Sequence, residues 1–304
     1  MKIAVAGTGA VGGYFGAYLH KAGNEVVFLA RGNNLKLLKD NGLTIQAETE
    51  SFHVTAPFTD RAENLSDIDL LLFCVKSTAT AEMAEYLRPF LKEECLIMTL
   101  QNGVDNEEIL SDTFGRDRIL SAATYIQANV IEAGVVQQIG IAPRLVIGAL
   151  SEGFTDKVNE IALIFNAAKI ETFPSTNVLE VKWKKLLWNV TFNPLSAVIE
   201  ENVGAIFEHQ ALKTIAINMC KEAISVARKL GYNVDENFYV TILEQGKFAR
   251  NHKTSMLQDK LNGKSMELES ICGYLVKKGK ILGVNTPVIE TMYSLLSFHE
   301  QKNK

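Results

Sequence analysis

The sequence predicts an α/β domain followed by an all-helical domain. In the first half of the chain, short apolar runs suited to buried strands alternate with helical periods, which is typical of a largely parallel sheet covered by helices. Beyond Pro174 the alternation stops and helical periods dominate. The chain has 304 residues, whereas a single core stops growing at roughly 250 to 300 residues. We therefore expect domains at residues 1–174 and 175–304.

Composition narrows the class of protein. A hydrophobic content of 47% and a charged content of 22% are ordinary for a globular protein, and a net charge of -4 gives no basic surface for nucleic acid. No apolar run approaches the roughly 18 residues of a membrane span, and strand-like sequence begins at Lys2 without a charged leader. We expect a cytoplasmic protein without nucleic-acid or membrane partners. The sequence does not fix the oligomeric state, and a homodimer stays open.

The cysteines do not suggest a metal or disulfide framework. They form no Cys-x-x-Cys pair and lie far apart in apolar contexts, which is typical of reduced core cysteines in a cytosolic protein. No zinc site is expected at Cys74, Cys95, Cys220 or Cys272.

A glycine-rich turn lies near the start of the chain. An apolar run at residues 2–6 leads directly into Gly-Thr-Gly-Ala-Val-Gly, and a helical pattern follows. In this context Gly7 permits a tight turn, Gly9 lets the backbone approach a pyrophosphate, and Gly12 allows close packing of helix on strand. The helix N-terminus supplies free N–H donors. We therefore expect a dinucleotide site, rather than a purely structural turn, at Gly7, Thr8, Gly9, Ala10, Val11 and Gly12.

The end of the second expected strand, residues 25–30, indicates which dinucleotide binds. An NAD enzyme generally carries Asp or Glu about 20 residues past the glycines, but here the strand ends in Arg31. A guanidinium suits the 2′-phosphate of NADP, because charge-assisted hydrogen bonds to phosphate are strong. NADP(H) is therefore expected. The alternative is that Arg31 is a solvated charge at a strand end.

Two further apolar strands, at residues 69–75 and 96–100, deliver polar side chains at their carboxyl ends. Lys76 follows the first strand and Asn102 follows the second. Ligands bind at this edge of open α/β sheets, so we expect both residues to contact the cofactor. For Asn102 the alternative is an ordinary Asn-Gly turn.

The remaining elements follow the same patterns. Alternating residues at 43–45 and 52–54 predict an antiparallel hairpin at the edge of the sheet. Strand patterns at 119–125, 145–149 and 170–173 and a helix near 156–168 complete the α/β domain. Helices are expected at 177–197, 210–230, 236–247, 265–280 and 287–298.

The first helix of the second domain carries an unusual polar stripe. Residues 183–198 are apolar almost all round, which predicts burial, yet Lys185, Asn189 and Asn193 stand four residues apart and so share one face. One ammonium and two carboxamides suit a ligand held in a cleft, although two satisfied core amides and a snorkelling lysine would give the same pattern. Pro194 is expected to kink or end the helix near Asn193.

Two features further along could complement this stripe. Ser255 and Gln258 fit a capping box, so Ser255 is either a helix N-cap or a hydroxyl that binds a carboxylate at the helix start. Glu267 is either a carboxylate in a first helical turn or a polar partner inside a cleft.

In combination, these motifs resemble the ketopantoate reductase (2-dehydropantoate 2-reductase) family over essentially the full length. The glycine turn with Arg31, Lys76, the Asn102-Gly103 pair, the polar stripe followed by Pro194-Leu195, residues 255–259 and Glu267 stand in the family's order and approximate spacing. The resemblance implies NADPH-dependent reduction of ketopantoate to pantoate, a step of pantothenate and coenzyme A biosynthesis. It implies NADPH contacts from the glycine turn, Arg31, Lys76 and Asn102, catalytic roles for Lys185 and Glu267, and substrate contacts from Asn189, Asn193, Ser255 and Glu267.

The chain also departs from the family pattern. Ser77-Thr78-Ala79 replaces a Thr-Trp-Gln-like segment, and two family asparagines would fall at His252 and Val203, with Asn251 and Asn202 beside them. Another short-chain 2-oxo acid therefore stays open as substrate. A nonenzymatic NADPH-sensing protein and a 3-hydroxy acid dehydrogenase are further alternatives.

A 2-oxo acid that accepts hydride needs a proton donor for its carbonyl oxygen, and Lys185 can supply that proton. Burial should lower the pKa of Lys185 from its reference of about 10.4, and a nearby Glu267 would oppose that shift.

Overall fold

The computed structural model describes residues 1–302 and divides the chain into two compact units. Unit 1 holds Met1–Asn102 and Asn106–Leu179. Unit 2 holds Gly103–Asp105 and the chain from Glu180 onward. The division near the middle of the chain thus falls between Leu179 and Glu180, and the domain boundary expected after Pro174 stays a prediction.

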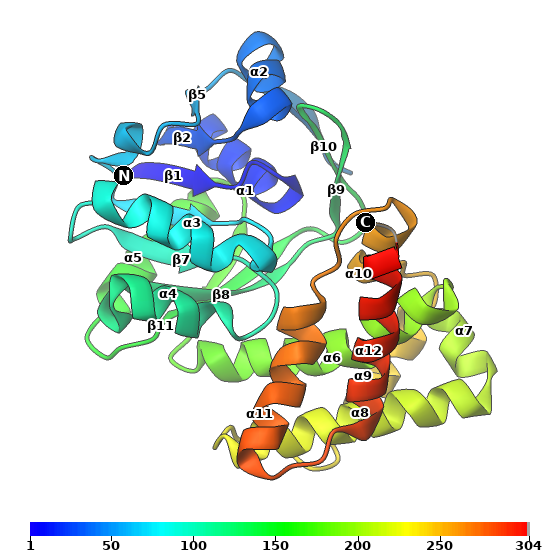
Figure 1. The fold of residues 1–304 in the computed structure, drawn as a ribbon. Coiled ribbons are helices and arrows are strands. Elements are labelled where there is room, and N and C mark those ends of the chain that lie inside the picture. Colours follow the sequence, from blue (N-terminus) through cyan, green and yellow to red (C-terminus); the bar gives the residue numbers. More distant parts are fainter. Residues whose placement is uncertain (303–304) are drawn as a thin grey trace. The chain divides into compact units, whose positions relative to one another are not determined.

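A mixed sheet of eight strands forms the centre of unit 1 (Figure 1). Its strands are β1 (Lys2–Ala6), β2 (Glu25–Leu29), β5 (Phe58–Thr59), β6 (Leu70–Phe73), β7 (Leu96–Thr99), β8 (Ile119–Tyr125), β11 (Arg144–Ala149) and β12 (Glu171–Pro174). Their order is β12-β11-β8-β7-β6-β1-β2-β5, and β8 and β11 form the antiparallel pair of an otherwise parallel sheet. Strand order reverses at β1, which has β2 on one side and β6 on the other. Ligands of open α/β sheets bind at such a reversal.

Both faces of this sheet are buried. Along β1, Ile3 and Val5 belong to one buried cluster, and Ala4 and Ala6 belong to a second cluster on the opposite face. Burial on both faces explains why these strands are apolar without alternation. The helices of unit 1 are α1 (Ala10–Lys21) and α5 (Thr155–Ala167) in the first cluster, α3 (Thr80–Leu87) and α4 (Asn106–Phe114) in the second, α2 (Gly32–Asn41), and short 3₁₀ turns η1 (Ala62–Leu65), η2 (Ser77–Ala79), η3 (Arg88–Phe90) and η4 (Arg116–Arg118).

The expected hairpin forms, but its expected place at the edge of the main sheet is wrong. Strands β3 (Leu43–Gln46) and β4 (Ser51–Val54) pair antiparallel and join a second sheet with β9 (Ala128–Glu132) and β10 (Val135–Gln138). Helix α1 packs against this second sheet as well as against the main one. The pairing of β3 with β10 joins distant parts of the chain, so the local pattern could not predict it.

Unit 2 is all-helical, as expected. Its helices are α6 (Val178–Ile199), whose first two residues belong to unit 1, α7 (Val203–Glu208), α8 (Gln210–Lys229), α9 (Phe238–Phe248), α10 (Ser255–Leu261), the π-helical turn η5 (Glu269–Gly273), α11 (Tyr274–Leu282) and α12 (Pro287–Lys302). Helix α8 packs against α7, α9, α11 and α12 (Figure 1). The sequence patterns did not predict α7. Within residues 1–302, no helix is both long and apolar enough to span a membrane.

Helix α6 is buried, as its all-round apolar sequence predicted. Trp183, Leu187 and Phe192 are at most 1% exposed. The helix runs through Pro194 to Ile199, so the expectation that it could end near Asn193 is wrong. A proline removes one helical hydrogen bond, but the buried side chains on both sides of Pro194 hold the helix together.

The short segment Gly103–Asp105 belongs to unit 2 although its neighbours in sequence belong to unit 1. Val104 is buried in the same core cluster as Trp183, and the hydroxyl of Ser270 donates a hydrogen bond to Asp105 Oδ2 at 3.0 Å. Gly103 has a positive φ of 85°, and a Cβ at this position would lie 2.8 Å from Ser270 Cβ. This close packing requires glycine.

Candidate active site

The glycine turn between β1 and α1 shows why two of its glycines are needed. Gly7 has a φ of 101°, and a Cβ there would lie 2.7 Å from Val75 N at the end of β6. A Cβ on Gly12 would lie 2.2 Å from Gly7 O and 2.8 Å from a Val5 methyl carbon, as expected for close packing of helix on strand. A Cβ on Gly9 would meet nothing within 4 Å. Gly9 therefore leaves open space beside the first turn of α1, which fits a pyrophosphate.

The turn is also tied to the end of β2. The Thr8 hydroxyl donates to Leu29 O at 3.1 Å, and Gly7 N donates to the same oxygen at 3.4 Å. Two residues after Leu29, Arg31 is exposed and precedes the first residue of α2. The structure thus brings Arg31 to the same edge of the sheet as the glycine turn, where no carboxylate follows β2.

Lys76 and Asn102 follow the neighbouring strands β6 and β7, so they lie at the same edge. Lys76 is exposed and Asn102 is half-buried. Gln101 joins their loops, because its Nε2 donates to Val75 O and to Thr80 Oγ1, both at 2.8 Å. The Asn106 side chain donates to Asn102 O at 2.8 Å and closes the second loop. Sequence reasoning missed this positioning role of Gln101, although its place at a strand end was visible.

The polar stripe of α6 is present in unit 2. Lys185 is partly exposed, while Asn189 and Asn193 are 8% and 2% exposed. At 1.5 Å per residue, the stripe spans about 12 Å. Among the described residues, Asn193 Oδ1 is buried without a hydrogen-bond partner. A buried amide oxygen left in this way is costly unless a ligand or water supplies a donor.

The pKa of Lys185 is strongly perturbed. Burial is the largest cause and the charge of Lys182 is the second, and together they lower the pKa of Lys185 to about 7. The charge of Glu267 acts in the opposite direction. Lys182 is itself buried, at 4% exposure, and the sequence analysis missed it. Its position three residues before Lys185 on an apolar helix was the available signal.

Ser255 is not the helix cap that the sequence indicated. Thr254 is the N-cap of α10, and its hydroxyl accepts a hydrogen bond from Leu257 N at 3.2 Å. Ser255 is the first residue of the helix and is exposed. Gln258 does not complete a capping box with Ser255, because its Nε2 donates to Lys253 O at 2.7 Å. The Ser255 hydroxyl is thus not used for capping.

Glu267 lies just before the helix that was expected to contain it. The expected helix at 265–280 starts only at Leu268 and opens with the π-helical turn η5, so Glu267 is not in a first helical turn. Glu300 fixes the preceding residues, because its carboxylate accepts hydrogen bonds from Met266 N at 2.5 Å and from the Ser265 hydroxyl at 3.2 Å. Glu300 on α12 thus fixes the backbone directly before Glu267, whose side chain is partly exposed.

Asn202 and Asn251, which stand beside the positions of the two missing family asparagines, are both exposed. Asn202 directly precedes α7. Asn251 directly precedes His252, whose ring packs edge-on against that of Trp188 with 5.4 Å between the ring centroids. Val203 is fully buried. A substrate contact of Asn202 or Asn251 therefore stays a hypothesis.

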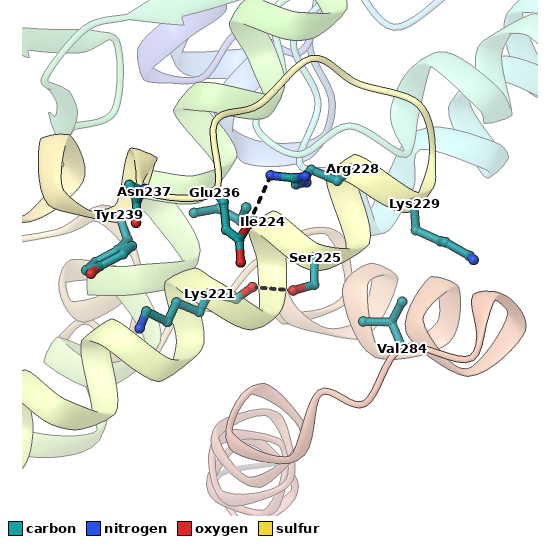
Figure 2. Close-up of a pocket in the computed structure, with 9 residues that line it drawn as sticks. All are labelled: Lys221, Ile224, Ser225, Arg228, Lys229, Glu236, Asn237, Tyr239 and Val284. Carbon is teal, nitrogen blue, oxygen red and sulfur yellow. Dashed lines mark hydrogen bonds and ion pairs between the residues drawn. The ribbon is translucent and has the colours of Figure 1, made fainter.

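A surface hollow of about 550 Å³ on unit 2 involves none of the predicted residues. Arg228 and Glu236 form an ion pair across part of it at 3.6 Å, and the Ser225 hydroxyl donates to Lys221 O at 2.9 Å (Figure 2). Arg228 and Glu236 neutralise each other, and none of the residues predicted from the sequence lines this hollow, so the candidate site is placed at the stripe. The lining residues are Lys221, Ile224, Ser225, Arg228, Lys229, Glu236, Asn237, Tyr239 and Val284.

Comparison with known proteins gives matches over nearly the whole chain. The family described as "Ketopantoate reductase PanE/ApbA" matches residues 3–152, and its C-terminal counterpart matches residues 177–300. A 2-dehydropantoate 2-reductase from Nostoc sp. is 28% identical over 311 aligned residues, covering 100% of this chain and 96% of the relative.

Solved structures agree with this match. A PanE/ApbA family ketopantoate reductase from Ralstonia eutropha superposes with a TM-score of 0.92 at 29% identity, covering 100% of this chain and 99% of the other. A D-mandelate dehydrogenase solved with NADH and anilino(oxo)acetate superposes with a TM-score of 0.92 at 23% identity, covering 100% and 99% of the two chains. The second likeness shows a shared fold alone.

Proposed function

The chain belongs to the ketopantoate reductase family, and from this premise we propose that it reduces ketopantoate to pantoate with NADPH. Membership makes the chain an NADP-dependent oxidoreductase. The choice of substrate and the roles of individual residues are the proposal. The observation that carries it is the stripe of α6, where a lysine with a pKa lowered to about 7 shares one face with two buried carboxamides.

Unit 1 is assigned to the cofactor. The open space at Gly9 and the free first-turn N–H groups of α1 suit the pyrophosphate, and exposed Arg31 suits the 2′-phosphate. Lys76 and Asn102 are assigned further contacts at the same edge of the sheet. When bound, NADPH supplies the hydride that reduces the carbonyl carbon.

Unit 2 is assigned to the 2-oxo acid. Lys185 donates a proton to the carbonyl oxygen as negative charge develops there, so the product is a 2-hydroxy acid and Lys185 becomes neutral. Asn189 and Asn193 orient the substrate by hydrogen bonds, and the Asn193 Oδ1 acceptor is available for a hydroxyl of the substrate. Ser255 and Glu267 are assigned the remaining polar contacts, and the charge of Glu267 favours the protonated form of Lys185.

The test is a panel of substrates assayed by loss of NADPH absorbance. Ketopantoate should give the highest kcat/KM, above 2-oxoisovalerate, phenylglyoxylate and pyruvate. Phenylglyoxylate is included because the fold also serves a D-mandelate dehydrogenase. If another 2-oxo acid gives a higher kcat/KM than ketopantoate, that acid is the substrate and ketopantoate is not. NADP-dependent oxidation of 3-hydroxy acids, or NADPH binding without turnover of any acid, would overturn the proposed reaction.

A further inference from the structure

Two buried hydroxyl groups join the helices that carry the proposed substrate contacts. Ser196 lies on α6 three residues after Asn193, and Thr254 directly precedes Ser255 at the start of α10. Both side chains are fully buried, and their hydroxyl oxygens are 2.6 Å apart. They form a polar contact within the helical core of unit 2.

The direction of the hydrogen bonds follows from counting protons. The Ser196 hydroxyl donates to Asn193 O at 3.0 Å, and a hydroxyl has one proton to give. Thr254 must therefore donate to Ser196, while Thr254 Oγ1 accepts from Leu257 N at 3.2 Å. The result is one continuous chain that runs from Leu257 N through Thr254 and Ser196 to the Asn193 carbonyl.

A second contact holds the far end of α10 to the same helix. Lys260 Nζ donates to Ala197 O at 2.8 Å and pairs with Glu200 at 3.0 Å, and its side chain is only 8% exposed. Helix α10 has seven residues and would be marginal alone. Buried Met256 and Leu257 anchor the helix in the core, and the contacts with α6 add polar links to this packing. The link beside Ser255 is the one between the Thr254 and Ser196 hydroxyls.

We propose that Ser196 and Thr254 are positioning residues that hold Ser255 and Asn193 in the relative placement that the 2-oxo acid requires. The inference rests on the proposed function, because it assumes that Ser255 and Asn193 contact the substrate. Neither hydroxyl touches the substrate itself, since both are enclosed in the core. Loss of either hydroxyl interrupts this series of hydrogen bonds, so each loss should weaken binding of the 2-oxo acid without weakening binding of the cofactor.

The test compares variants that remove or keep the hydroxyl. Thr254→Val and Ser196→Ala should each raise the KM for ketopantoate by about tenfold or more, with kcat within about threefold. Thr254→Ser keeps the hydroxyl and should stay within about threefold of the unmodified enzyme in KM. Because one loss already breaks the chain, the double variant should be little worse than Thr254→Val, which is a non-additive result. The dissociation constant for NADPH, titrated without substrate, should stay unchanged in all variants.

Thr191→Val is the matched control. Thr191 lies on the same helix, is fully buried, and donates its hydroxyl to Leu187 O at 2.6 Å, but it points away from the stripe by helical spacing. This control should leave the KM for ketopantoate unchanged. If it raised KM as much as Thr254→Val, general loss of packing would explain the effect and the inference would fail.

Other results separate this inference from the proposed function. Turnover by the unmodified enzyme is measured first, and the best 2-oxo acid of the panel replaces ketopantoate if it is preferred. Absence of any turnover would sink the proposed function, and the positioning role with it. An unchanged KM in both Thr254→Val and Ser196→Ala would sink the positioning role alone. If Thr254→Val does not fold, Ser196→Ala still decides, since it leaves the cap of α10 in place.

Discussion

Lys182 and Lys185 lie three residues apart on α6, and the charge of Lys182 helps to lower the pKa of Lys185 to about 7. Burial is the larger cause. A lysine in this range is protonated often enough near neutral pH to donate, and it releases its proton far more readily than an ordinary lysine. Burial and the ammonium group of Lys182 thus lower the pKa of the proposed acid, while the charge of Glu267 limits the shift.

The pH dependence of reduction should follow this pKa. Because Lys185 must be protonated to donate, kcat should be level below about pH 7 and fall about tenfold per pH unit above it. Lys182→Met removes the charge that repels the Lys185 ammonium, so the fall in kcat should begin at higher pH. Glu267→Gln removes an attraction and should move this fall to lower pH. Lys184→Met is the control, since Lys184 is exposed beside the Phe238 ring, and an equal movement there would refute a specific role for Lys182.

Lys185 should also reduce stability. Its pKa is lower in the folded protein than in the unfolded chain, so the unfolded chain binds more protons between about pH 7 and 10.5 and stability rises with pH over that window. The full penalty acts below about pH 7. Lys185→Met should raise the free energy of unfolding by roughly 1 to 4 kcal/mol at pH 6, and the gain should shrink towards pH 10. Urea unfolding at several pH values checks this, and a gain of equal size at all pH values would contradict it.

Cofactor choice should depend on Arg31. A charge-assisted hydrogen bond to the 2′-phosphate is worth about 1.5 to 3 kcal/mol, so NADPH should be preferred over NADH by roughly 10- to 100-fold in kcat/KM. Arg31→Ala should narrow this preference, because it weakens the binding of NADPH and leaves the binding of NADH unchanged. Lys36→Ala, an exposed cation on the following helix, serves as the control. Equal kcat/KM for both cofactors in the unmodified enzyme would rule out the assignment.

Glu267 should distinguish ketopantoate from its deoxy analogue, 3,3-dimethyl-2-oxobutanoate. If the carboxylate accepts the C4 hydroxyl, the analogue cannot make that hydrogen bond, and the preference for ketopantoate should be at least about 10²-fold in kcat/KM. Glu267→Ala should lose most of that preference because activity toward ketopantoate falls further. Glu269→Ala is the neighbouring control, since Glu269 accepts a hydrogen bond from Tyr293 at 2.7 Å. Comparable rates for the two acids with the unmodified enzyme would remove ketopantoate as the intended substrate.

The sequence predicted those parts of the fold that local burial determines. The strand at 119–125 was predicted with the bounds it has, because each residue from Ile119 to Thr124 is buried and the run is continuous. The second sheet was not predicted, because β3 pairs with β10 across a long stretch of chain. Periodicity within a segment cannot report such a partner.

At the candidate site, residue types were easier to predict than their contacts. The spacing of the stripe placed Asn189 and Asn193 on one buried face. The capping-box pattern, by contrast, indicated Ser255 as the cap of α10, whereas the structure has Thr254 in that role. Both side chains carry a hydroxyl at the start of the helix, and the Thr254 hydroxyl contacts that of Ser196, which lies far away in sequence and so could not inform the local pattern. Roles for Lys185, Ser255 and Glu267 remain proposals for the experiments above.

The assignment of Gly103–Asp105 to unit 2 matters for the design of hybrid proteins from two relatives. A helical fragment cut from Glu180 onward would lack Val104 in its core and the carboxylate that accepts the Ser270 hydroxyl. A hybrid that joins unit 1 of one relative to the helices of another should therefore take the three residues that correspond to Gly103–Asp105 from the relative that supplies the helices. Two sequence segments, separated by more than seventy positions, thus form one compact unit.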